Sequence, residues 1–186
     1  MPFRMLCVLG AISLFVWFGG QNQCCSETKG GQAMNIEVKS TAFADGRMIP
    51  KVYTCQGKDI SPPLSWAGVP AEAKSIALIM DDPDAPRGTW VHWVLYNIPP
   101  DSKGLEENVP RGASLSNGAK HGKNSWPKLG YGGPCPPSGT HRYYFKIYAL
   151  DILLPHQSEG TKNQLLKAMQ GHILAEGQLM GTYSKK

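Results

Sequence analysis

The strongest fold signal is one stretch of sequence: Ser75-Ile76-Ala77-Leu78-Ile79-Met80 followed directly by Asp81-Asp82-Pro83-Asp84-Ala85-Pro86. The first half is continuously apolar, which is typical of a strand buried on both faces. The second half holds three carboxylates within four residues and two prolines that stiffen the backbone. Because Asp82 precedes a proline, its backbone favours an extended conformation. The sequence therefore predicts a buried strand that presents carboxylates where it leaves the sheet.

Two further segments predict strong strands. Thr89–Ile98 is expected to be central in a sheet, because both of its sides are mainly apolar. Strict alternation would place Trp90, His92, Val94, Tyr96 and Ile98 on one side and Val91, Trp93, Leu95 and Asn97 on the other. His141–Leu150 predicts the third strong strand, and weaker patterns predict strands at 36–39, near Trp66 and at 178–183.

Helical signals are confined to the end of the chain. Thr161-Lys162-Asn163-Gln164 is a capping box that predicts a helix over Leu165–Met169. Gly171 interrupts the pattern before His172–Glu176, so we expect one or two late helices. The connection over 101–130 is rich in glycine, serine and asparagine, and a connection of this length is uncommon unless it is functional or contains small elements of its own. The sum is a mostly β fold.

Composition bounds the class of protein. A chain of 186 residues fits one domain that can bury a real core. With 21 glycines, 15 prolines and only 18% charged residues, it favours many turns and short strands over a helical bundle. The formal net charge of +5 is mild and the sequence has no block of like charges, so we expect no nucleic-acid partner.

The N-terminal residues form a separate segment. Arg4 precedes an apolar run over 5–18 and then a polar stretch, which is typical of a secretory signal. As a helix the run would reach about 21 Å, short of a bilayer core of about 30 Å. We expect residues 1–20 to be a signal peptide or N-terminal anchor, 21–33 a polar tether and 34–186 the folded domain. An uncleaved anchor and a lipid on Cys24 stay open as alternatives. The expected location is periplasmic, envelope-attached or secreted, with membrane contact only through this segment.

Two of the five cysteines, Cys55 and Cys135, belong to the expected domain. Both lie in loop-like stretches flanked by glycine or proline. An exported chain can keep a disulfide, so these two residues either form one bridge or remain partly buried free thiols.

Four side chains are candidates for a binding site. His141 and Tyr143 are two residues apart on one strand, so they project from the same face with Cα atoms about 6.5–7 Å apart. His92 lies mid-strand among large apolar neighbours and could equally be a hydrogen-bonded core histidine. Asp82 could orient and charge a neighbouring histidine, or cap a turn, a role that is equally open for Asp84. Arg142 points to the opposite side and is expected to be an ion-pair partner.

The motifs around these residues resemble the signatures of the phosphatidylethanolamine-binding protein family. The resemblance lies in Asp82-Pro83-Asp84-Ala85-Pro86 with His92-Trp93, and in Gly132-Gly133-Pro134-Cys135-Pro136-Pro137 leading to Gly139-Thr140-His141-Arg142-Tyr143. Asp59–Trp66 and Glu176–Tyr183 are similar to the family too, and the similarity covers about residues 35–184. Lacking an extra C-terminal helix, the chain resembles the bacterial and archaeal Raf-kinase-inhibitor-like branch.

This resemblance implies a fold and a site. The fold would be a β-sandwich with a large central sheet, short helices near the C-terminus and a small anion pocket. Asp82, His92, His141 and Tyr143 would bind the anion, and the pocket wall would include Pro86, Trp90, Gly133, Pro134 and Cys135. Many family members have glycine or alanine where Cys135 stands here.

The implied function is a binding protein for phosphate-like anions or phospholipid headgroups, with no cofactor, no catalytic residue and no metal. Imidazole and phenol donate hydrogen bonds to an ionised acceptor, which are the stronger class. The expected partner is a small anionic ligand such as phosphate or phosphoethanolamine. A role as a kinase or protease inhibitor rests on the family alone, and no partner protein is specified.

Two enzymatic alternatives stay open. Cys135 and His141 could form a thiol nucleophile and its base in a hydrolase. Two histidines and Asp82 could bind iron or zinc, although the sequence lacks the short histidine spacing typical of such sites.

Overall fold

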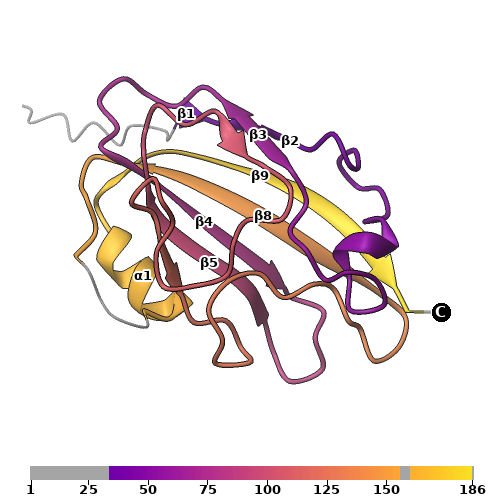
Figure 1. Cartoon of the computed structure of the whole chain (residues 1–186). Coiled ribbons are helices and arrows are strands. Elements are labelled where there is room, and N and C mark those ends of the chain that lie inside the picture. Colours follow the sequence, from indigo (N-terminus) through magenta and orange to yellow (C-terminus); the bar gives the residue numbers. More distant parts are fainter. Residues whose placement is uncertain (1–33, 156–159, 186) are drawn as a thin grey trace, which may run out of the picture. The chain divides into compact units, whose positions relative to one another are not determined.

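The computed structural model describes residues 34–155 and 160–185, and Figure 1 shows their arrangement. The predictions of a signal or anchor, a polar tether and a lipid on Cys24 lie outside these residues. The described part of the chain contains nine strands, one α-helix and one 3-10 helix, joined by loops. The mostly β fold predicted from the sequence is confirmed. No helix in this part is both long and apolar enough to cross a membrane.

A six-stranded sheet forms the large layer, in the order β1-β9-β8-β4-β5-β7. All its pairings are antiparallel except the short parallel one between β1 and β9. Its members are β1 (Met34–Asn35), β4 (Ser75–Asp82), β5 (Trp90–Ile98), β7 (Lys120–Gly122), β8 (Thr140–Leu150) and β9 (Ile173–Ser184). The strand that holds Ser75–Met80 is thus central, and all its residues are buried, as its continuous apolar sequence predicts.

A three-stranded antiparallel sheet forms the second layer, in the order β2-β3-β6. Its strands are β2 (Glu37–Lys39), β3 (Leu64–Ala67) and β6 (Gly104–Leu105). A 3-10 helix, η1 (Lys51–Tyr53), lies between β2 and β3 in the chain. The connection over 101–130 thus contains β6 and β7, which explains how so long a segment is accommodated.

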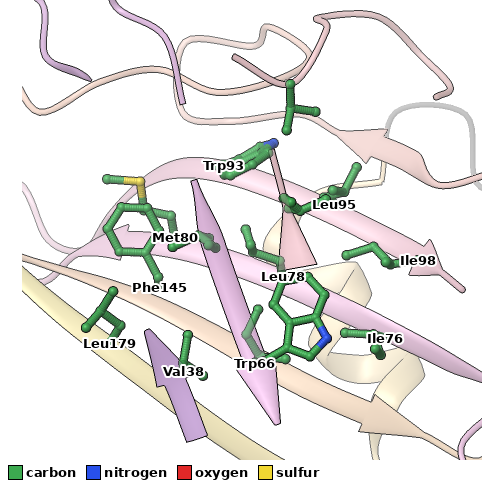
Figure 2. Packing of buried hydrophobic residues seen from close by; sticks show 14 of the residues in the cluster. Val38, Trp66, Ile76, Leu78, Met80, Trp93, Leu95, Ile98, Phe145 and Leu179 are labelled. Atoms are coloured by element: carbon green, nitrogen blue, oxygen red, sulfur yellow. The ribbon is translucent and has the colours of Figure 1, made fainter. Parts of the chain in front are cut away.

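Two apolar clusters fix the two faces of the large sheet. One fills the space between the sheets, where Trp66 and Val38 of the small sheet face Ile76, Leu78 and Met80 of β4 (Figure 2). The other packs the alternate residues of β4, Ala77 and Ile79, against Leu165 and Met169 of α1 (Lys162–Met169). In Figure 1, α1 and the strands β2 and β3 accordingly lie on opposite sides of the large sheet. Asp81 and Asp82, at the end of β4, continue this alternation, so their side chains point to opposite faces of the sheet.

The helix begins where the sequence predicts, but it is followed by a strand. Thr161 caps α1, and its side chain and that of Gln164 form both hydrogen bonds of the capping box. The prediction that 172–176 could be helical is wrong, because β9 already begins at Ile173. Gly171 has φ +77°, which ends the helical path. From Leu150↔Ile173 onward the chain pairs with β8, so the ladder decides the conformation of this segment.

The side assignment expected for Thr89–Ile98 holds for Val94 and Tyr96 and for Trp93 and Leu95, but it is wrong at Val91 and Ile98, because β5 contains two bulges. Met80 pairs with Trp93 and Asp81 with Val91, so His92 is an extra residue between them. A second irregularity falls near Asn97, whose φ is +55°. As a result Trp93, Leu95 and Ile98 join the cluster between the sheets, and Val91, Val94 and Tyr96 pack on the α1 side. The first bulge matters most, because it changes where His92 points.

Candidate functional site

A cavity of about 460 Å³ opens where β4 ends and β8 begins. Its wall is built from the ends of these strands, the start of β5 and loops far apart in sequence. The residues that line it are Cys55, Asp59, Asp82, Ala85, Pro86, Trp90, His92, Arg111, Asn124, Trp126, Lys128, Leu129, Tyr131, Gly132, Gly133, Cys135, Pro136, Pro137 and His141. A larger hollow of about 870 Å³ runs along β2 and β9, but none of the predicted site residues lines it.

Asp82 and His141 form a buried pair at the closed end of this cavity. Nδ1–H of His141 donates to Oδ2 of Asp82 at 2.7 Å, and the two side chains are only 9% and 5% exposed. The other carboxylate oxygen accepts the backbone N–H of Asp84 at 2.8 Å. Asp82 therefore both caps the turn after β4 and orients the imidazole. With Nδ1 occupied, Nε2 is the nitrogen of His141 that is left to contact a ligand.

His92 is held by the backbone of the 132–137 loop. Its Nδ1–H donates to the carbonyl oxygen of Gly132 at 2.7 Å, so the neutral ring carries its lone pair on Nε2. Burial lowers the pKa of His92, and the hydrogen bond to Gly132 and the charge of Asp82 only partly oppose this. A neutral imidazole accepts rather than donates at Nε2, which suits a hydroxyl group or a singly protonated phosphate. His92 is thus both a packed core residue and a cavity residue.

Tyr143 lies under the two histidines and does not line the cavity. It is fully buried, and its ring meets His92 edge-on with centroids 5.2 Å apart and stacks against His141 at 6.5 Å. Its hydroxyl lies near Asp82 and the backbone of Cys135, but it makes no hydrogen bond of good geometry with a described residue. Burial raises the pKa of Tyr143, and the nearby charge of Asp82 acts in the same direction. The structure therefore gives Tyr143 the position of a support for the imidazoles, where the sequence predicted a direct ligand contact.

The 132–137 loop is seated tightly on the segment that follows η1. The N–H of Gly133 donates to Oδ1 of Asp59 at 2.7 Å, and Arg111 forms an ion pair with Oδ2 of the same carboxylate at 2.8 Å. A side chain at Gly133 would come within 2.5 Å of the Tyr53 carbonyl oxygen. Gly133 lines the cavity as predicted, but Pro134 does not, and its carbonyl accepts the Cys55 N–H at 3.2 Å.

Cys55 and Cys135 form a disulfide with Cα atoms 5.5 Å apart, which decides between the two alternatives left open by the sequence. In this state the Cys135 sulfur is not available as a thiolate nucleophile. Among the residues with described positions, no three histidine, cysteine, aspartate or glutamate side chains are grouped so that they could hold a metal ion. Arg142, which points away from the cavity as expected, pairs with Asp84 at 2.6 Å and holds the pKa of that carboxyl at about 2.

Sequence reasoning missed a turn in the long connection. Trp126 is 37% exposed, and its ring meets Trp90 and His92 edge-on at 5.3 Å and 5.1 Å between centroids. Buried Asn124 fixes the turn, because its Oδ1 accepts the backbone N–H groups of Trp126 and Lys128, both at 3.0 Å. Only Asn124, with Pro127 three residues later, marks this turn in the sequence, which is a weak signal.

The cavity holds charges of both signs. Asp59 and Asp82 contribute carboxylates, and Arg111 and Lys128 contribute cations. Arg111 is paired with Asp59, whereas Lys128 has no ion-pair partner in the described part of the chain. Two basic residues therefore line the cavity, although no lysine or arginine of the two motifs does. Both cations lie outside those motifs, in the connection over 101–130.

Comparison with known proteins places these features in a wider group. Residues 39–184 match the family described as phosphatidylethanolamine-binding protein. A protein of Methanothermobacter thermautotrophicus named UPF0098 protein is 56% identical over 150 residues, which are 81% of this chain and 99% of that protein. A UPF0098 protein of Chlamydia muridarum is 50% identical over 155 residues, with the same coverage of both chains.

Two solved structures share the fold. The first is described as a putative phosphatidylethanolamine-binding protein homolog, CT736, from Chlamydia trachomatis. It is 47% identical, with a TM-score of 0.76 over 83% of this chain and 100% of that chain. The second is YbcL of E. coli, described as a new member of the mammalian family of these proteins. It is 32% identical, with a TM-score of 0.76 over 82% of this chain and 99% of that chain.

Proposed function

The chain belongs to the phosphatidylethanolamine-binding protein family, and on this basis we propose that it binds a phosphate monoester of the phospholipid-headgroup type in the cavity at the end of β4. Family membership supports a binding-protein fold, and proteins of this family are in general binding proteins without enzymatic activity. The choice of ligand comes from the chemistry of the cavity.

The observation that carries the proposal is the buried Asp82–His141 pair. A histidine whose Nδ1–H is held by a carboxylate presents Nε2 in a fixed direction, and in the protonated ring this nitrogen donates. A hydrogen bond from a cation to a phosphate oxygen is charge-assisted and is among the stronger hydrogen bonds in proteins. Asp82 balances the added charge, so a protonated His141 can be buried at an acceptable cost.

The rest of the wall supports a phosphate monoester over inorganic phosphate alone. The cavity of about 460 Å³ is within the size range of sites for small organic molecules. Beyond the imidazoles, the wall is apolar at Trp90, Trp126 and Leu129, which could pack against a carbon chain. Lys128 then offers a positive charge to the phosphate of a ligand such as phosphoethanolamine, whereas the carboxylate of Asp59 is already held by Arg111 and the Gly133 N–H.

Calorimetric titration of the full chain with phosphoethanolamine at pH 6.5 tests the proposal. We expect wild-type protein to bind and His141→Ala to bind at least tenfold more weakly, because a charge-assisted hydrogen bond contributes about 1.5–3 kcal/mol. His172→Ala is the matched control, since His172 donates to Asp151 at 2.8 Å in a similar pair outside the cavity. Equal loss in both variants, or no binding by the wild type at millimolar ligand, would refute the proposal.

Titrations with inorganic phosphate, with ethanolamine and with phosphatidylethanolamine vesicles distinguish the sources of the ligand. Binding of phosphoethanolamine but not of ethanolamine would place the recognition in the phosphate. A regulatory role toward a kinase or protease has no residue of this cavity to support it and follows from family membership alone, so a pull-down from the native host is its test.

We also propose that the chain is exported and contacts a membrane only through its N-terminal segment. The basic and apolar start of the sequence supports this, and so does the Cys55–Cys135 disulfide, because such bonds persist mainly in oxidising compartments. Fractionation of the native cells, with mass spectrometry of the mature N-terminus, checks the proposal. Recovery of the whole chain in the cytoplasm with two free thiols at Cys55 and Cys135 would refute it.

A further inference from the structure

The Cys55–Cys135 disulfide lies at the mouth of the cavity. Both cysteines line the cavity and both residues are exposed, so a small thiol in solution can approach the bond. The bridge joins the segment after η1 to the 132–137 loop across a sequence separation of 80 residues. It is thus the covalent link between two parts of the cavity wall that the chain does not connect locally.

The two halves of this loop are held in different ways. Tyr131, Gly132, Gly133 and Pro134 are fixed by hydrogen bonds to Tyr53 O, His92 O, Asp59 Oδ1 and Cys55 N. Residues 135–139 have no backbone–backbone hydrogen bond to the rest of the described chain. Cys135, Pro136 and Pro137 nevertheless line the cavity, so the disulfide is the strongest tie on this part of the wall before β8 begins at Thr140.

We propose that the Cys55–Cys135 disulfide is a redox gate, which holds residues 135–139 in place at the cavity mouth when oxidised and loosens them when a thiol reductant opens the bond. The inference rests on the proposed function for its binding readout, but the loosening itself is a property of the protein without ligand. The deep end of the cavity, with Asp82, His92 and His141, is held by its own hydrogen bonds and stays in place.

The chemistry is thiol–disulfide exchange with a small thiol of the reductant class. A thiolate attacks one of the two sulfur atoms, the S–S bond breaks, and the other cysteine leaves as a thiolate that takes up a proton. A second thiolate attacks the mixed disulfide and releases the second cysteine. Two reductant thiols are thereby oxidised to one disulfide, while Cys55 and Cys135 gain two electrons and two protons.

The gate predicts that the effect depends on the size of the ligand. Inorganic phosphate would contact only the deep end, so its affinity should change less than twofold on reduction. Glycerophosphoethanolamine would extend to Cys135 and Pro137 at the mouth, so its affinity should fall at least fivefold. The loss should come from faster dissociation, because the mouth wall no longer holds its position.

The experiment uses the full chain in a background that carries Cys7→Ser, Cys24→Ser and Cys25→Ser, so that Cys55 and Cys135 are the only cysteines left. Affinity for both ligands is measured before reduction, after reduction with two free thiols verified, and after reoxidation. Amide hydrogen exchange in the absence of ligand is followed in peptides that cover residues 134–140. Peptides from β4 show whether the protein remains folded. The double variant Cys55→Ser/Cys135→Ser should behave as the reduced protein and ignore the reductant.

A reversible loss of glycerophosphoethanolamine affinity, with faster exchange at 135–139 and unchanged β4, supports the gate. Unchanged affinity for that ligand with two verified thiols overturns it. If the oxidised protein binds neither ligand, the proposed function fails and the exchange data alone judge the gate: faster exchange confined to 135–139 supports it, and equal exchange overturns it. If the double variant does not fold, the gate is tested by reducing the disulfide-bonded protein under conditions in which the β4 amides remain protected from hydrogen exchange.

Discussion

Nδ1 of His141 lies 2.7 Å from Oδ2 of Asp82, although the two residues are 59 positions apart in the chain. The pair connects the end of β4 to the start of β8, and both side chains are almost entirely buried. Asp81, the residue just before, points to the other face of the sheet and binds Lys146 and Lys162 there. Asp81 and Asp82 therefore lie on opposite faces of the sheet, so a mutation of Asp81 is a matched control for the same mutation of Asp82.

The first prediction concerns Asp82. Replacing it by Asn removes the negative charge that supports a protonated His141, so phosphoethanolamine affinity at pH 7 should fall about tenfold, as expected for one charge-assisted hydrogen bond. Titration calorimetry measures the change. Asp81→Asn is the control, since this side chain lies across the sheet from the cavity, and its affinity should stay within twofold of wild type. Equal affinity of wild type and Asp82→Asn would contradict the role given to the pair.

The second prediction concerns the stability that Asp81 provides. Its carboxylate is 2% exposed and accepts from Lys146 Nζ at 3.1 Å as well as from Lys162 of α1. Because the substitution Asp81→Asn leaves two partly buried ammonium groups without their counter-charge, it should lower the free energy of unfolding by about 2–3 kcal/mol. Urea unfolding gives the value. A change below about 0.5 kcal/mol would mean that solvent already screens the network.

The third prediction is the pH dependence of binding. A protonated imidazole loses its N–H donor at Nε2 as pH rises, so affinity for phosphoethanolamine should fall above about pH 7. The second ionisation of a phosphate monoester, near pH 6, would by itself raise affinity over part of this range, so a fall identifies the protein group. Calorimetry from pH 5.5 to 8 tests this, and His141→Ala should remove the fall. A flat wild-type profile would sink the idea of a protonated imidazole donor.

The fourth prediction is the pH dependence of stability. Burial lowers the pKa of His92 and also that of His121, whose Nδ1–H donates to Gly112 O. Below about pH 6.5 the unfolded chain therefore binds protons that the folded chain does not. The contribution of these histidines to the free energy of unfolding is fully present above this pH. It is lost as the pH falls toward their lowered pKa values, by up to about 1.4 kcal/mol per pH unit for each histidine.

Urea midpoints between pH 5 and 7.5 test this prediction. His92→Gln should reduce the slope by one histidine's share, whatever its effect on stability at neutral pH. An unchanged slope in this variant would show that His92 does not contribute. Asp84, held at a pKa of about 2 mainly by its hydrogen bond to Arg142, affects stability only below about pH 4 and leaves this window clear.

The fifth prediction concerns Gly133. A Cβ there would lie 2.5 Å from Tyr53 O and 2.8 Å from the Thr54 Cα, both on rigid backbone. Gly133→Ala must therefore displace the loop that positions Gly132 and His92, and phosphoethanolamine affinity should fall more than tenfold with a loss of about 1–3 kcal/mol in stability. Gly139→Ala is the comparison, because a Cβ meets nothing within 4 Å and the cost, about 1–2 kcal/mol, comes only from its φ of +68°. Similar affinity losses in both variants would argue against a specific role for the close packing of Gly133 against Tyr53 and Thr54.

Much of the fold followed from local patterns. The continuous apolar run of Ser75–Met80 predicted a strand that is buried on both faces, and the capping box at Thr161 predicted the start of α1. The family motifs located the cavity, because Asp82, His92 and His141 all line it. The motifs did not reveal Trp126, Arg111 and Lys128, which come from a connection without periodicity and reach the cavity through long-range contacts.

Local sequence was enough to predict the long strands β4, β5 and β8, where the helix begins and which residue types could bind an anion, since each depends on neighbours within a few positions. Long-range packing settled the rest. The pairing with β4 produces the bulge at His92, and the pairing with β8 makes β9 begin at Ile173. The packing of the loops brings Cys55 and Cys135 together as a disulfide, and the packing of the strands places Tyr143 beneath the imidazoles. These outcomes depend on contacts between residues distant in the chain, whose geometry exists only after the sheets have assembled.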